Sequence, residues 1–212
     1  DGYLDLLVMA LTYDDRPETM AASSTIFYGS KDGFSTERSE NFPTYCYGTA
    51  RLADVNHDGY LDIIVVDKHE LLKIYLGGPD GYSPERTWDV ELPAPRGVML
   101  NVGDINKDGY LDIVVAMMGH YIRRPETLYI LYGGPDGYSM ENSQQLTAGY
   151  SAHCVALADL NNNGNLDLYV PAYSSFVSRE LPAQIFWGNG KTIDLENPLN
   201  LPAEAPTAAL MI

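Results

Sequence analysis

The sequence predicts an all-β protein built from repeated four-stranded antiparallel sheets, and three observations lead to that prediction. An acidic phrase recurs along the 212 residues, a second phrase rich in glycine and tyrosine alternates with it, and short β-branched segments flank both. We find no convincing amphipathic helix by periodicity. Hydrophobic residues make up 45% of the chain, the composition of a folded protein with a core.

The acidic phrase has three complete copies and one truncated copy. It reads ADVNHDGYLD at 53–62, GDINKDGYLD at 103–112, ADLNNNGNLD at 158–167 and DGYLD at 1–5. Ten of the 29 acidic residues lie in these copies, in a chain of net charge −16. Successive copies are about 50 to 57 residues apart. This period is too long for a TPR or ankyrin repeat and lies near the length of a four-stranded propeller blade.

Each repeat predicts four strands, taken here in chain order. The first strand leads into the acidic phrase, at 47–53 and 98–103. The second follows that phrase at once and is rich in β-branched residues, at 61–66, 111–116 and 166–170. The third belongs to the tyrosine-glycine phrase, which reads IFYGSKDGFS at 26–35, IYLGGPDGYS at 74–83, ILYGGPDGYS at 130–139 and IFWGNG at 185–190. A weaker fourth strand closes the unit, as at 87–92.

One four-stranded sheet cannot bury both of its faces alone, so such units stack radially around an axis. We therefore expect residues 1–212 to form a single β-propeller domain, or a segment of one, made of four-stranded antiparallel blades. The acidic phrase is then the loop between the first and second strands of each blade.

The spacing of the acidic phrase, Asp-x-Asn-x-Asp-Gly-x-x-Asp, predicts a calcium site. It alternates oxygen ligands with spacers, and glycine at the sixth position permits a sharp turn. Calcium prefers six to eight oxygens at about 2.3–2.6 Å in flexible geometry. The expected ligands, with the seventh residue acting through its carbonyl, are Asp54, Asn56, Asp58, Tyr60 and Asp62; Asp104, Asn106, Asp108, Tyr110 and Asp112; Asp159, Asn161, Asn163, Asn165 and Asp167; and, in the partial loop, Asp1, Tyr3 and Asp5. We expect two to three complete Ca²⁺ sites and one partial site.

The phrase allows two other interpretations. Asp, Asn and Gly are also common turn formers, so a single copy would carry little weight, whereas three copies in register favour a metal. An EF-hand requires a bidentate Glu at position 12 and flanking helices. Position 12 is Val65, Val115 or Val170, inside a predicted strand, so an EF-hand is excluded.

The phrases DVNHDGYLDIIV, DINKDGYLDIVV and DLNNNGNLDLYV resemble FG-GAP/VCBS repeats, the blades of integrin α-type β-propellers. The IFYGSKDGFS strands resemble the tyrosine-glycine strand of bacterial VCBS repeat proteins. The resemblance covers essentially the whole chain. It implies a secreted or cell-surface (extracellular or periplasmic) protein whose blades are clipped by calcium on one face. Two departures are Asn163, which replaces an Asp and should weaken the third site, and the half-length first loop.

The ends of the chain raise the question of ring closure. The chain begins at the second strand of one blade, and residues 207–212 are predicted to be the first strand of another. That strand either pairs with residues 4–9 or joins a further blade from missing sequence or another copy. Because the rings of the resembled family are usually seven-bladed, we expect a larger ring of seven or eight blades.

Calcium on one face leaves the opposite face for a protein or glycan ligand. The longest loops between second and third strands, at 11–24, 118–127 and 173–182, carry basic and aromatic residues there, and Lys68 holds the position equivalent to Arg124 and Arg179 in its repeat. The candidate ligand-binding residues are Tyr13, Lys68, His120, Tyr121, Arg124, Phe176 and Arg179. The alternative is that the basic residues only pair with local acids such as Glu126 and Glu180.

Several functions are not expected. The net charge of −16 without a basic stripe argues against nucleic acid, and no apolar run reaches the roughly 20 residues of a membrane helix. No nucleophile elbow or phosphate-binding glycine loop occurs, so we do not expect an enzyme. The sequence favours an extracellular recognition or adhesion module. The alternative is a non-catalytic accessory propeller of a secreted polysaccharide-degrading enzyme.

Overall fold

The computed structural model describes residues 2–10, 24–42, 48–67, 71–93, 97–117, 126–148, 154–171 and 182–202. These residues form four antiparallel sheets. The only helical turn within these ranges is a 3₁₀ turn, η1 (Met140–Asn142). The predicted all-β class is therefore confirmed.

Strands that follow one another in the chain are also neighbours in each sheet. The strands of the successive sheets are β1 (Leu6–Val8), β2 (Ser24–Phe27) and β3 (Ser39–Phe42); β4 (Arg51–Ala53), β5 (Asp62–Val66), β6 (Leu71–Tyr75) and β7 (Thr87–Glu91); β8 (Gly97–Gly103), β9 (Asp112–Met117), β10 (Glu126–Leu131) and β11 (Ser143–Ala148); β12 (Ala156–Ala158), β13 (Asp167–Val170), β14 (Ala183–Phe186) and β15 (Leu199–Leu201). This is the meander that the repeat predicts.

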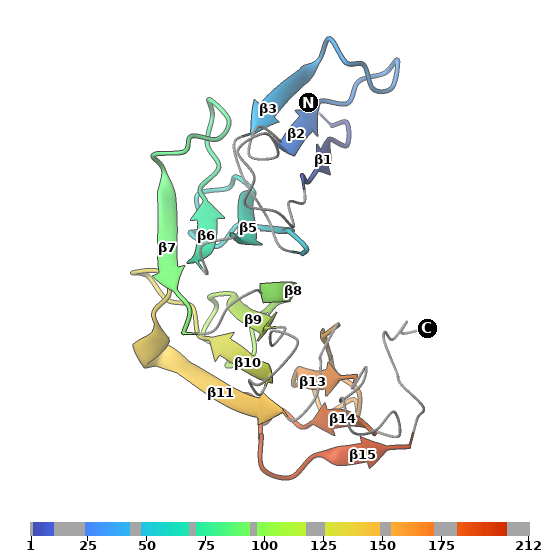
Figure 1. The fold of residues 1–212 in the computed structure, drawn as a ribbon, viewed down its shortest axis with the longest axis vertical. Helices are drawn as coiled ribbons and strands as arrows, with labels where there is room; N and C mark the ends of the chain where they lie inside the picture. Colours follow the sequence, from blue (N-terminus) through green and yellow to red (C-terminus); the bar gives the residue numbers. More distant parts are fainter. Residues whose placement is uncertain are drawn as a thin grey trace.

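The four sheets stand side by side along an arc, as propeller blades do (Figure 1). In the later sheets, β5, β8 and β13 lie toward the concave side of the arc, and β7, β11 and β15 lie on its convex side (Figure 1). The described residues of the first sheet supply three strands, of which β1 stands where the prediction places a second strand. Residues 207–212 lie outside the described residues, so ring closure stays a prediction.

The second strand of each middle sheet is buried on both faces, which explains why it is an apolar run and not an alternating one. In β5, Ile63 and Val65 pack in a cluster with the first sheet, and Ile64 and Val66 pack in a cluster with the third. All four are at most 2% exposed. Successive side chains of a strand point to opposite faces, so one strand supplies the apolar core of two interfaces.

The same division holds in β9. Ile113 and Val115 pack toward the second sheet, while Val114 and Ala116 pack toward the fourth. The apolar core is thus a series of layers between neighbouring sheets. Within the described part of the chain, no helix has the length and apolarity needed to span a membrane.

Candidate metal-binding loops

The three complete acidic phrases form the loops β4–β5, β8–β9 and β12–β13, and all three have the same backbone conformation. Their fourth residues have positive φ although none is glycine: His57 (61°), Lys107 (60°) and Asn162 (57°). Their sixth residues, Gly59, Gly109 and Gly164, have φ of 83° to 93°. L-residues seldom adopt the left-handed region, so a shared pair of such positions marks one specific loop conformation.

The first loop is organised by its own side-chain oxygens. Asp54 Oδ1 accepts a hydrogen bond from the Asp58 N–H (3.1 Å), and Asp54 Oδ2 accepts one from the Gly59 N–H (2.9 Å). Asn56 Oδ1 accepts from the Asp58 N–H (3.0 Å), and Asp58 Oδ1 accepts from the Tyr60 N–H (2.9 Å). An ionised carboxylate has about four lone-pair sites, so each Asp keeps acceptor capacity for a cation.

The third loop repeats this pattern with an amide at the fifth position. Asp159 accepts from the N–H groups of Asn163 (3.0 Å) and Gly164 (2.7 Å). Asn161 Oδ1 accepts from the Asn163 N–H (3.0 Å), and Asn163 Oδ1 accepts from the Asn165 N–H (2.8 Å). The loop conformation therefore does not depend on a carboxylate at position five.

The second loop differs at one atom. Asp104 Oδ2 accepts from the Gly109 N–H (3.2 Å), as its counterpart does in the other loops. Asp104 Oδ1, however, is buried and accepts no hydrogen bond, the one such side-chain atom found in the described residues. A buried carboxylate oxygen without a partner is costly unless a cation or another donor reaches it.

The ninth-position aspartates, Asp62, Asp112 and Asp167, are completely buried and begin the second strands. Each accepts backbone hydrogen bonds from two separate segments. For Asp112, Oδ2 accepts from the Ile105 N–H in the loop (2.8 Å), and Oδ1 accepts from the Gly133 N–H after the third strand (3.0 Å). The same pairs recur at Asp62 and Asp167. In the partial loop, Asp5 Oδ1 accepts from the Gly29 N–H (2.8 Å).

Burial sets the acid–base behaviour of these carboxyl groups. It raises the pKa of Asp112 to about 6, although the N–H groups of Gly133 and Ile105 act in the opposite direction. Burial also raises the pKa of Asp62, and the neighbouring charges of Asp58 and Asp54 add to that effect. Burial therefore disfavours the ionised form of these carboxyl groups, and a cation bound in the loop would stabilise that form.

Sequence reasoning missed the residues that hold the loop from the third strand. A side chain at Gly133 would collide with the Leu111 carbonyl oxygen, so only glycine lets this strand approach the loop. The Tyr138 hydroxyl donates to that same carbonyl (2.7 Å). Gly77, Leu61 and Tyr82 repeat the arrangement in the second sheet. The Gly and Tyr that recur in the tyrosine-glycine phrase were the sequence signal that could have identified these residues.

The donor set of these loops suits a hard divalent cation. In the described residues, no three carboxylate, imidazole or thiol groups converge as a ready-made metal cluster. Each loop instead offers a mixture of carboxylate, amide and carbonyl oxygens, and calcium accepts all three. The chemistry of this set and the unpartnered Asp104 oxygen fit calcium. The ligands expected there would be those of positions one, three, five, seven and nine.

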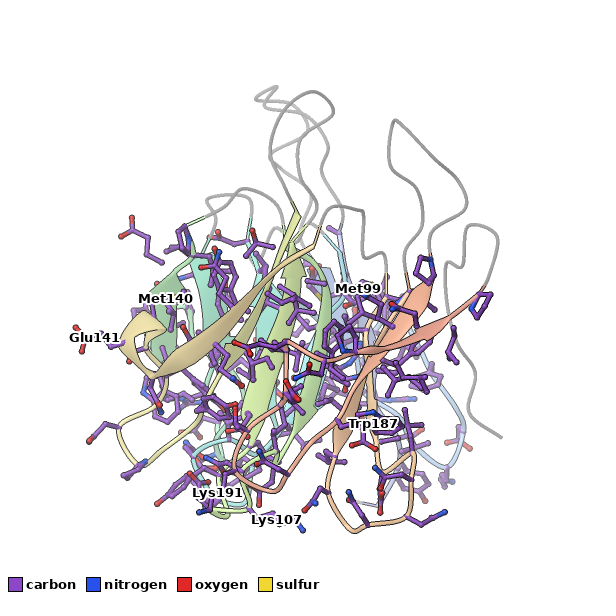
Figure 2. All side chains as sticks on the ribbon, turned by 90° about the horizontal axis from the view of Figure 1, so that it is seen from below. Met99, Lys107, Met140, Glu141, Trp187 and Lys191 are labelled. Carbon is purple, nitrogen blue, oxygen red and sulfur yellow. The ribbon has the colours of Figure 1, made fainter. Side chains whose placement is uncertain are left out.

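Two lysines show which turns share a face with the acidic loops. Lys107, in the β8–β9 loop, and Lys191, in the turn after β14, lie at the same end of the sheets (Figure 2). The acidic loops and the third-to-fourth-strand turns therefore share one face. The predicted ligand-binding residues Tyr13, Lys68, His120, Tyr121, Arg124, Phe176 and Arg179 all lie outside the described residues, as does Asp1 of the partial loop.

Comparison with known protein families identifies the repeat. A family model described as "FG-GAP-like repeat" matches residues 54–115 and 104–170, which together span more than half of the chain. No curated protein matches. One similar solved structure is the crystal structure of BBS1N in complex with ARL6DN, soaked with lead. It has 9% sequence identity and a TM-score of 0.30, with 75% of this chain and 59% of that chain covered. This chain thus spans less than two thirds of that neighbour. The chain belongs to the FG-GAP-like repeat family.

Proposed function

We propose that this chain is a calcium-stabilised β-propeller module that acts outside the cell as a non-catalytic recognition or adhesion surface. Three loops of one conformation present oxygen-rich side chains on one face, and repeats of this family are typical of extracellular proteins. The single observation that carries the calcium part is Asp104 Oδ1, a buried carboxylate oxygen that accepts no hydrogen bond.

The charge of the loops supports the same proposal. The first loop holds Asp54, Asp58 and Asp62, and the second holds Asp104, Asp108 and Asp112. Three carboxylates within nine residues repel one another, and this repulsion opposes folding unless a cation neutralises it. Extracellular calcium modules bind with dissociation constants of about 10⁻⁴–10⁻³ M, which suits millimolar calcium. The third loop, with Asn163, is expected to bind most weakly.

Thermal unfolding in EDTA and in 5 mM calcium tests the proposal. At these affinities each site adds about 1–2 kcal/mol to the free energy of unfolding, so two sites raise the melting temperature by roughly 5–15 °C. Asp108→Asn should remove about half of that rise, because it takes one charge from the second loop. The matched control is Asp136→Asn, which takes the same charge from an exposed turn of the same sheet and should keep the full rise. Equal melting temperatures in EDTA and calcium would refute calcium binding.

The recognition part of the proposal concerns the face opposite the loops. Its candidate residues, such as Arg124 and Arg179, would hold an anionic or sugar ligand. A glycan array probed with the whole chain in calcium buffer tests this. Binding to a defined class of glycan supports recognition, whereas an empty array directs the search to a protein ligand. An accessory role beside a polysaccharide-degrading domain predicts that the glycans bound are polysaccharide fragments.

A further inference from the structure

The fourth residue of an acidic loop lies against the next sheet of the arc. The His57 ring of the first loop stacks on the Tyr110 ring of the second loop, with centroids 5.1 Å apart and planes inclined by 11°. Tyr110 is the seventh residue of its loop, whose carbonyl is an expected calcium ligand. The second loop is therefore in contact with the fourth residue of the loop that precedes it along the arc.

Lys107 occupies the same position in the second loop and lies on the third. Its Nζ is 3.8 Å from the point that a Cβ on Gly164 would occupy. Its Cδ is 3.6 Å from the corresponding point on Gly190, in the turn after β14. The ammonium group therefore rests beside the sixth residue of the third loop, on the face shown at the lower edge of Figure 2.

The two contacts differ in charge. The second loop, with three carboxylates, receives an aromatic ring, whereas the third loop, with Asp159 and Asp167 alone, receives a full positive charge. Both oxygens of Asp159 accept backbone hydrogen bonds, unlike Asp104, which leaves one oxygen unpartnered. The third loop thus combines fewer negative charges with a neighbouring cation, while its first aspartate is satisfied in the same way as Asp54 of the first loop.

We propose that Lys107 is an affinity-determining residue, which holds the calcium affinity of the third loop low so that calcium occupies the first two loops alone. This inference rests on the proposed calcium function. A unit charge a few ångströms from a divalent ion changes binding by roughly tenfold when both are near the surface, less at high salt. Because the Lys107 ammonium group already neutralises part of the negative charge of the third loop, calcium gains less electrostatic energy by binding there.

Calorimetric titration with calcium chloride tests the inference. The wild-type chain should take up two calcium ions in the millimolar range. Lys107→His reproduces the ring that the first loop offers to the second, and it should raise the calcium affinity of the third loop about tenfold, so that a third ion is measured. The added site should disappear in the double variant with Asp159→Asn. The converse change, His57→Lys, should weaken the second site by a similar factor.

Lys31→His is the matched control, since Lys31 is an exposed lysine in the β2–β3 turn of the first sheet, a different sheet from the third loop. It removes the same charge and should leave the stoichiometry at two. Melting temperatures in EDTA show whether each variant is folded before titration. Three equal sites in the wild type, or no change at the third loop in Lys107→His, would overturn the inference while calcium binding itself stands. No calcium uptake by any loop would overturn the proposed function, and this inference with it.

Discussion

At the scale of single residues, the ninth-position aspartate has a role that exists without any metal. Asp112 is completely buried and joins the acidic loop to the end of the third strand through backbone hydrogen bonds. The sequence pattern predicted this residue as a calcium ligand only. Its burial and its three backbone partners make it part of the sheet itself.

Asp112→Ala should therefore destabilise the protein even in EDTA. The N–H groups of Gly133 and Ile105 would lose their acceptor inside the fold, at a cost of about 1–3 kcal/mol each. We expect the free energy of unfolding to fall by about 3 kcal/mol in urea denaturation. Asp136→Ala, at an exposed turn, is the control and should change it by less than about 0.5 kcal/mol. A small effect of Asp112→Ala in EDTA would leave the residue with a metal role only.

The Asp112 carboxyl group should also make the stability of the protein depend on pH. Burial raises the pKa of folded Asp112 from 3.8 to about 6, so the folded state keeps its proton to higher pH than the unfolded state does. In EDTA, its contribution to stability is full below about pH 4 and is lost as the pH rises toward 6. Asp112→Asn carries no such proton and should show a shallower decline over that range.

At the scale of elements, the third strand approaches the acidic loop so closely that its glycine has no substitute. A Cβ on Gly133 would collide with the Leu111 carbonyl oxygen, and the Tyr138 hydroxyl donates to that same oxygen. The tyrosine-glycine phrase is thus a set of contacts to the acidic phrase, and the two phrases recur together because one positions the other.

Adjacent glycines allow a matched test of this contact. Gly133→Ala should push the third strand away from the loop and lower the free energy of unfolding by about 2 kcal/mol or more. At Gly134 a Cβ would meet nothing within 4 Å, and φ lies outside the left-handed region. Gly134→Ala should therefore be neutral or slightly stabilising. Equal melting temperatures of the two variants would show that the backbone relaxes without cost.

The strands were predictable from sequence because β5 and β9 combine β-branched runs with turn residues at both ends. The loop was predictable because each copy repeats one spacing of oxygen ligands. The structural role of Asp112 was not, since a buried carboxylate and a metal ligand look identical in a sequence. The approach of Lys107 to the next loop was not either, because it depends on the angle between neighbouring sheets, which no local pattern encodes.

At the scale of the whole molecule, stability is distributed between neighbouring sheets. Val114 and Val115 are adjacent, equally buried and identical in type, yet Val114 packs toward the fourth sheet and Val115 toward the second. Polar contacts join the same interfaces, such as the Asn101 amide donating to the Val155 carbonyl (3.1 Å). Each layer of core belongs to one pair of sheets, as in other repeat proteins.

This arrangement predicts that Val114→Ala and Val115→Ala weaken different interfaces between sheets. Both should lower the free energy of unfolding by about 2 kcal/mol, because each removes similar buried volume. Hydrogen exchange should separate them: Val114→Ala should reduce protection mainly in β12–β14, and Val115→Ala mainly in β4–β7. Identical exchange patterns would mean that the sheets unfold as a single cooperative unit.

The bonds between the ninth-position aspartates and the third-strand glycines all remain inside one sheet, from Asp5–Gly29 to Asp167–Gly188. A duplicated or exchanged repeat would therefore bring its own loop support with it. It would need to match its neighbours in the shape of two apolar faces and in the few polar contacts between sheets. Such a chain can gain or lose whole units by recombination of its gene, each unit arriving already able to hold its own loop. The units of this protein are accordingly suited to transplantation into a host propeller of similar interface.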